Sequence, residues 1–378
     1  MKNIVYAFIS MTVSGSVIFL LFKLTELITR HFFSASWHYR ILKCVVLFFY
    51  IPFGTLYALL LKNAFIKLLG SSPSANGANY NNGTITAIMN ALKGFGINYS
   101  QLSSYLISIW IVGIIVLFVW QIICYIKFHH TISVYRNQAN PHILELANLC
   151  AKQQGISKPI NLYVNEFIDT PMLIGFLTPS ILLPTDQLDP QSAKYVLTHE
   201  LIHYKNRDLF VKFAMLIIRI IHWFNPLIYL LLKDLDKWCE YSCDEKNVLN
   251  LPADLRKQYG RVILDAISVM PTYGTSFSTP FLMPKQKLKE RLAFMINAKR
   301  MSMKARVLSY ILMLSLMTFG VATAYAAETA NNNLDTVITE VNEQIIISEV
   351  ASTISQDLSS SEPERQERLK VYTDLINP

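Results

Sequence analysis

Long apolar runs dominate the pattern of hydrophobic and polar positions in this chain. Four runs approach or exceed the roughly 20 residues that a helix needs to cross a bilayer, and they cover 4–22, 41–61, 105–126 and 306–325. The segment between the third and fourth runs mixes polar and apolar residues. The pattern predicts a mostly α integral membrane protein with four transmembrane helices, a membrane domain over 1–127 and an α+β domain over 128–305.

Composition and charge agree with this organisation and orient the spans. The chain is 52% hydrophobic and only 16% charged, whereas soluble domains are about 25% charged. Lys and Arg mark the cytoplasmic side of a membrane. The segment 127–306 carries 23 Lys and Arg against 15 Asp and Glu. Domain 128–305 is therefore expected in the cytoplasm, and since membrane orientation accounts for the basic excess, no direct contact with nucleic acid is expected.

The tail 326–378 differs from the rest in charge, with ten acidic against three basic residues. It is expected outside the cell together with the N-terminus. Its stretch LDTVITEVNEQIIISEVASTI favours an amphipathic helix or a strand. The sequence ATAYAAE at the end of the fourth run also matches a small-residue signal-peptidase site, so cleavage after Ala327 is an alternative.

The cytoplasmic segment contains short strand patterns ahead of its helices. INLYV (160–164) alternates, and PMLIGFLTPSILLP (171–184) holds two apolar runs separated by Thr178-Pro179. This predicts a strand pair with an exposed edge. A substrate peptide could add to that edge as a further strand, and the residues expected there are Leu173, Ile174 and Gly175.

A helix that carries two histidines follows these strands. Asp189 supplies an N-cap and Pro190 the first helical position of QSAKYVLTHELIHYK. His199 and His203 are four residues apart, so both imidazoles lie on one face and can bind one zinc ion. Glu200 lies beside them, suited to take a proton from metal-bound water. The alternative is an amphipathic helix that carries two histidines by chance.

A second helical pattern, DLDKWCEYSCDE, supplies further ligands. Glu240 and Asp244 share a face, so Glu240 is the expected third zinc ligand, and Asp244 is an expected acceptor for an imidazole N–H. Asp208 is another such acceptor. The alternative for these acids is a solvated helix face. Cys239 and Cys243 have the same spacing and form a different ligand set with the histidines, but such a closed site would leave Glu200 without a role.

The apolar stretch 209–232 between these helices is long enough for a fifth span. Asn225-Pro226 interrupts it, however, and Pro breaks helices. A spanning helix would also place His203 and Glu240 on opposite sides of a bilayer about 30 Å thick. If the zinc site exists, this stretch forms two helices that double back, packed on the membrane surface or on the other spans.

The stretches GFLTPSILLP, THELIHYKNRDLF, WFNPLIYLL and CEYSCDE resemble the BlaR/MecR-type antirepressor membrane zinc metallopeptidases. The resemblance covers roughly residues 1–325. It implies a gluzincin-like cytoplasmic domain in a multi-pass protein of the bacterial plasma membrane. It also implies one zinc ion, bound by His199, His203 and Glu240, with Glu200 as the catalytic base and Asp244 in support.

The family relays an outside signal to cytoplasmic cleavage that leads to loss of a transcriptional repressor. The resemblance therefore implies a protein substrate, with a cytoplasmic DNA-binding repressor as one candidate. Members that sense β-lactams carry a penicillin-binding domain after the fourth span, where this sequence has only the acidic tail, so direct β-lactam sensing is not expected. A second oxyanion donor is expected, and Tyr204, Arg207 and His222 are near in sequence.

Three other functions are weighed against this one by features of the sequence. An HtpX/CAAX-processing-like membrane protease shares HExxH followed by Glu-x-x-x-Asp. A non-catalytic signalling receptor would keep the zinc fold, although the intact Glu200 argues against it. A metal transporter is disfavoured because the predicted spans lack Asp, Glu and His near their centres. The expected partners are the protein substrate and the lipid bilayer, and the sequence leaves a homodimer open.

Overall fold

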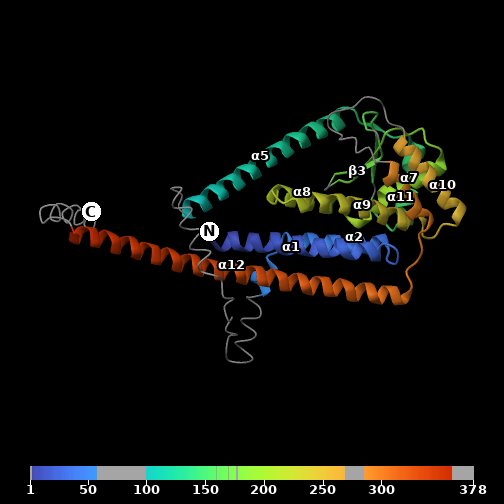
Figure 1. Ribbon diagram of the computed structural model, residues 1–378. Helices are drawn as coiled ribbons and strands as arrows, with labels where there is room; N and C mark the ends of the chain where they lie inside the picture. Colours follow the sequence, from blue (N-terminus) through green and yellow to red (C-terminus); the bar gives the residue numbers. More distant parts are fainter. Residues whose placement is uncertain are drawn as a thin grey trace.

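The computed structural model describes residues 2–57, 99–158, 160–168, 170–175, 178–268 and 285–359 (Figure 1). It is mostly helical with one small sheet, which confirms the mostly α prediction. Its helices include α6 (Pro141–Gln153), α7 (Pro190–Asn206), α10 (Ala253–Ser268) and α11 (Lys285–Ile296).

Three of the described helices are long and apolar enough to cross a membrane, which agrees with a membrane location. They are α1 (Lys2–Thr29), α5 (Tyr99–Val134) and α12 (Met303–Ser359), and they contain the predicted spans 4–22, 105–126 and 306–325. α12 does not end with the predicted span but continues as one helix to Ser359, so the described part of the tail is helical. No Gly or Pro interrupts it after residue 320.

The predicted span 41–61 differs from the structure. Its helix, α2 (Ala35–Phe48), begins at the Ser34 N-cap and has only 14 residues. It ends there because Pro52 disfavours helical backbone in the residue before it. Residues 58–61 lie outside the described residues. α2 packs against α1 and α9, so in the described chain it belongs to the helical core and is not a long, lipid-facing span.

Residues 209–232 form two antiparallel helices, as predicted. α8 (Asp208–Ile221) and α9 (Pro226–Val248) are joined by a short turn, where the side chain of Asn225 accepts a hydrogen bond from the N–H of Leu227. The turn is bonded to α1, since Nδ1 of His222 lies 2.9 Å from Oγ1 of Thr12. The hairpin runs beside α1 and α2 (Figure 1) and returns the chain to the end where α7 lies.

The sheet has the order β1-β2-β4-β3. β2 (Asn161–Val164) pairs parallel with β4 (Ser180–Leu183), β3 (Met172–Ile174) pairs antiparallel with β4, and β1 is Asn137–Gln138. The strand pair predicted within 171–184 is therefore present, and β3 lies at an edge of the sheet. The buried side chains of Ile181 and Leu183 pack on α6 and α7.

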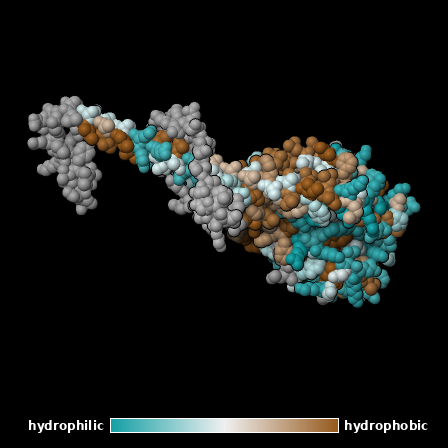
Figure 2. Space-filling model, turned by 90° about the horizontal axis from the view of Figure 1, so that it is seen from below, coloured by the Kyte–Doolittle hydropathy of each residue, from teal (hydrophilic) through white to brown (hydrophobic). Residues whose placement is uncertain are grey.

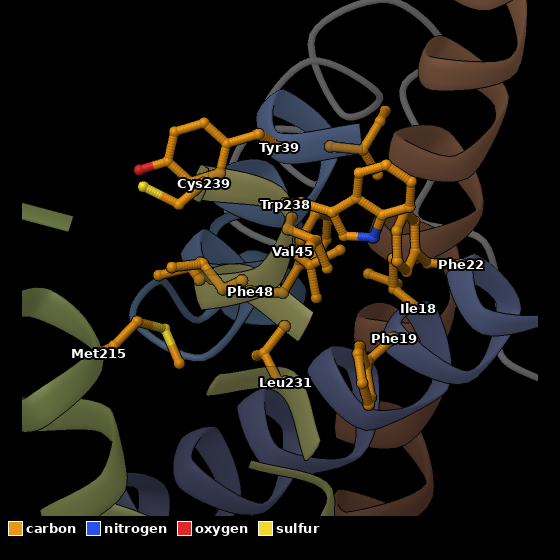
Figure 3. Close-up of a cluster of buried hydrophobic side chains, with 14 of the residues drawn as sticks. Ile18, Phe19, Phe22, Tyr39, Val45, Phe48, Met215, Leu231, Trp238 and Cys239 are labelled. Atoms are coloured by element: carbon orange, nitrogen blue, oxygen red, sulfur yellow. The ribbon is translucent and has the colours of Figure 1, made fainter. Parts of the chain in front are cut away.

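The largest core lies where α1, α2, α8 and α9 meet. Figure 3 shows its side chains, with Phe22 and Trp238 facing each other and with Tyr39 and Cys239 at one edge. Hydrophilic residues gather at the end of the molecule that holds α7, α10 and α11, while hydrophobic ones cover much of the helical middle (Figure 2). The helical core thus lies directly beside the polar end that carries the histidines.

Candidate metal centre

Helix α7 positions the HExxH residues. Oδ1 of Asp189 accepts hydrogen bonds from the N–H groups of Gln191 and Ser192, both at 3.0 Å, and Pro190 occupies the first turn, so the helix begins where the sequence predicts. It ends at Arg207, whose φ of 59° stops the helical path. The side chains of His199, Glu200 and His203 are all buried on this helix, against the sheet and α9.

The two imidazoles and Glu240 converge from different helices. Nε2 of His199 lies 3.2 Å from Nε2 of His203. Oε2 of Glu240 lies 3.4 Å from Nε2 of His199, and its Oε1 lies 3.5 Å from Nε2 of His203. Two imidazole nitrogens and one carboxylate form the donor set typical of a catalytic zinc site, which leaves a fourth position for water or substrate. These residues therefore fit a zinc ion.

A carboxylate holds the other nitrogen of each imidazole. Nδ1 of His203 lies 2.7 Å from Oδ2 of Asp208, and Nδ1 of His199 lies 3.2 Å from Oδ1 of Asp244. Such contacts fix the orientation of a ligating histidine and direct Nε2 to the metal. The structure thus brings both predicted supporting acids to the histidines, one to each ring.

Three further residues, none of them predicted from the sequence, contact the acids of the site. The hydroxyl of Tyr259 on α10 donates to Asp244 (2.7 Å) and lies 3.1 Å from Nδ1 of His199. The hydroxyl of Tyr39 on α2 donates to Oδ1 of Asp208 (2.6 Å). Arg291 on α11 contacts Asp244 and Glu240. These contacts join segments far apart in sequence, so no local spacing signals them.

The electrostatics of the site favour a cation. Burial alone raises the pKa of Glu240, but the charges of His203 and other cations outweigh it and hold this pKa well below its usual range. Burial lowers the pKa of His199, but Asp244 and Glu240 outweigh it and raise this pKa to about 9. Acidic groups therefore surround the imidazoles, and a divalent cation would supply the positive charge that protons otherwise provide.

The other predicted site residues have separate positions. Leu173 and Ile174 lie in the edge strand β3, and Gly175 follows it with a φ of +85°. β3 contacts α7, so this edge lies next to the histidine helix. His222, predicted as one possible oxyanion donor, lies at the opposite end of α8. Its Nδ1 lies 2.9 Å from Oγ1 of Thr12, and its Nε2 lies 3.2 Å from the carbonyl oxygen of Phe49. It is therefore not at the metal centre, because α8 separates the two by about 20 Å.

A second set of converging donors lies next to the first. Cys239 and Cys243 on α9 approach Nδ1 of His203 and the carboxylate of Asp208, and all four donor atoms lie within 4.8 Å of one another. The cysteine alternative raised from the sequence paired these thiols with both histidines, whereas this set contains His203 and Asp208 and leaves out His199. It uses the opposite nitrogen of the His203 ring, so it is distinct from the set formed by His199, His203 and Glu240.

Fold and site together define a class of protein: a membrane protein with a metallopeptidase-type centre on paired helices. Comparison with known families places the chain within this class. The model of the BlaR1 peptidase M56 family matches residues 6–295. The chain belongs to this family, which confirms the resemblance to BlaR/MecR-type proteins.

Individual relatives agree with the family match. The chain is 27% identical over 217 residues to the regulatory protein BlaR1 of Bacillus licheniformis, covering 55% of this chain and 36% of that relative. It is 25% identical over 224 residues to the methicillin resistance mecR1 protein of Staphylococcus aureus, covering 56% and 37%. A match of 25% to the regulatory protein BlaR1 of Staphylococcus aureus covers 81% and 53%. The first two matches span little more than a third of each relative.

Proposed function

We propose that this chain is an integral-membrane zinc metalloendopeptidase that cleaves a protein on the cytoplasmic side and so acts as a regulator of the antirepressor type. The observation that carries the proposal is the convergence of Nε2 of His199, Nε2 of His203 and the carboxylate of Glu240. The membership of the M56 peptidase family supports it. The basic charge of segment 127–306 supports the cytoplasmic placement.

His199, His203 and Glu240 would hold the zinc ion. A bound zinc ion lowers the pKa of water and polarises the carbonyl group of a peptide. Glu200, adjacent to His199 on the same buried helix, takes the proton of the attacking water and delivers it to the leaving amine. Asp208 and Asp244 keep the two rings in place during these steps through their contacts with Nδ1.

The edge strand β3 is the proposed binding element for the substrate. Its partner strand β4 is paired on both sides, with β2 and with β3, whereas β3 has only β4 as a neighbour in the described sheet. An extended peptide that adds to β3 makes main-chain hydrogen bonds with few demands on its side chains. The contact between β3 and α7 would bring such a peptide toward His199 and Glu200.

The experiment that tests the proposal compares cells that carry the wild type with cells that carry Glu200→Gln. Mapping of new protein N-termini should reveal at least one cytoplasmic protein that is cut only with the wild type, and a DNA-binding repressor is the first candidate. Glu166→Gln, a change of an acid in the loop after β2, is the matched control and should leave this cut intact. Identical maps for the wild type and Glu200→Gln would contradict a peptidase function.

A further inference from the structure

The four donors Cys239, Cys243, Asp208 and Nδ1 of His203 form a compact cluster that the proposed peptidase mechanism leaves partly unused. Sγ of Cys243 lies 3.3 Å from Nδ1 of His203, and Sγ of Cys239 lies 3.7 Å from the same atom. Sγ of Cys243 also lies 3.7 Å from Oδ2 of Asp208. The peptidase mechanism needs Asp208 and His203 here, but it gives no role to the two thiols.

The surroundings favour a bound ion over simple packing of two thiols. Cys239, Cys243 and Asp208 are buried, with exposed fractions of 1%, 0% and 2%. Figure 3 shows Cys239 at the margin of the apolar core, beside the ring of Tyr39 and not among the aliphatic side chains. Two sulfurs, a nitrogen and a carboxylate oxygen thus face one small volume from α7, α8 and α9.

We propose that this cluster is a second metal site, which binds a soft, thiophilic cation of the Cu(I) type. Paired thiolates select soft cations over hard ones such as Mg²⁺ or Ca²⁺, which prefer oxygen ligands. Cys239 and Cys243 are the primary ligands, and Nδ1 of His203 completes the set, with the carboxylate of Asp208 next to it. On binding, the two S–H bonds and the Nδ1–H bond of His203 are replaced by bonds to copper, and three protons leave to solvent. Copper enters and stays as Cu(I), so no electron is transferred.

The shared imidazole couples this site to the zinc site. His203 presents Nε2 to His199 and Glu240 and Nδ1 to the thiol cluster. A cation at the thiol cluster takes the place of the Nδ1–Asp208 hydrogen bond that orients the ring. A soft cation is therefore expected to loosen zinc, and the site would make the peptidase sensitive to soft metals.

The test uses the zinc-loaded full chain in detergent, kept free of oxygen and titrated with Cu(I) against a colour-changing Cu(I) chelator. The wild type should retain one Cu(I) per chain. Cys239→Ser and Cys243→Ser should each weaken this binding at least about tenfold. Cys150→Ser, a change of a buried free cysteine on α6, is the matched control and should bind as the wild type does.

Metal analysis of the same samples measures the coupling. Zinc should dissociate faster from the wild type once Cu(I) is bound, and Cys243→Ser should keep its zinc at the same Cu(I) concentration. X-ray absorption at the copper edge of the wild type should show sulfur neighbours, a readout that needs no variant to fold. Copper with only nitrogen and oxygen neighbours, or equal Cu(I) binding by the wild type and both serine variants, would overturn the proposal.

Discussion

The guanidinium of Arg291 lies against the carboxylate of Asp244, with Nε 2.6 Å from Oδ2 and Nη2 3.1 Å from Oδ1. Nη2 also lies 3.2 Å from Oε2 of Glu240. Both arginine and Asp244 are buried. Arg291 belongs to α11, which precedes α12 in the chain, and α12 is long and apolar enough to cross a membrane. One side chain therefore links the element next to this helix to the proposed zinc ligand Glu240.

Replacement of Arg291 by Met should destabilise the protein and weaken zinc binding. Burial raises the pKa of Asp244, but Arg291 foremost outweighs burial and lowers it to about 2. Loss of one partner of a buried pair costs about 3–5 kcal/mol, and loss of a group that supports a ligand costs 10–100-fold in metal affinity. Thermal unfolding in detergent and zinc competition measure the two effects. Lys289→Met, a change of an exposed residue on α11, is the control and should change neither.

The hydrogen bond from Tyr39 to Asp208 predicts that a substitution in α2 weakens zinc binding by the histidines. Tyr39→Phe removes one hydroxyl and leaves Oδ1 of the buried Asp208 without its 2.6 Å partner. The expected cost is about 1–3 kcal/mol, and the affinity for zinc should fall about tenfold. Tyr229→Phe removes a hydroxyl bonded to the carbonyl of Trp223, away from the site, and should leave zinc affinity unchanged. Equal zinc affinity in both variants would refute the link.

The pKa of His199 predicts how zinc affinity depends on pH. Burial lowers this pKa, and contacts with Asp244 and Glu240 outweigh burial and raise it from 6.5 to about 9 in the metal-free protein. The stability that this proton contributes is complete below pH 6.5 and is lost as the pH rises through about 9. Zinc needs the neutral ring, so its apparent affinity should rise from pH 6.5 to 9. Chelator competition measures it, and a flat or falling profile would contradict this assignment.

Glu245 on α9 forms a second connection between α9 and α2. Its carboxylate accepts hydrogen bonds from the N–H groups of Ala35 (3.2 Å) and Ser36 (3.0 Å), and from Oγ of Ser36 (2.8 Å). The acid thereby caps the N-terminus of α2, where negative charge is favourable. Glu245→Ala should lower stability by about 1–2 kcal/mol. Glu166→Ala, a change of an exposed acid in the loop after β2, should not, and the two melting temperatures in detergent decide between these outcomes.

Local signals in the sequence account for much of the fold and for the proposed ligands. Asp189-Pro190 starts α7 and Asn225-Pro226 starts α9, because capping and proline act within a few residues of a helix end. The spacing of four residues places His199 beside His203. The same spacing places Glu240 and Asp244 on one face of α9, and the structure brings Glu240 to both imidazoles.

Other features depend on contacts between distant segments and have no local signal. Tyr39 and Asp208 form a hydrogen bond although they are 169 residues apart in the sequence, and Arg291 and Asp244 do so at a separation of 47 residues. Tertiary packing alone brings such pairs together. The end of α2 does have a local signal, because Pro52 lies within the predicted span 41–61 and disfavours helical backbone in the residue before it. The length of the apolar run, in contrast, favours a longer helix. The continuation of α12 likewise had a signal in the absence of Gly and Pro between 321 and 359.

The most direct test of the account is the metal content of three purified full-length proteins, measured together with cleavage of the substrate found by N-terminus mapping. Glu200→Gln should hold as much zinc as the wild type and cleave nothing. Glu240→Gln should hold one zinc ion fewer per chain and also cleave nothing. Full zinc content in Glu240→Gln, or cleavage by Glu200→Gln at the wild-type rate, would contradict a zinc peptidase centre built from His199, His203, Glu240 and Glu200.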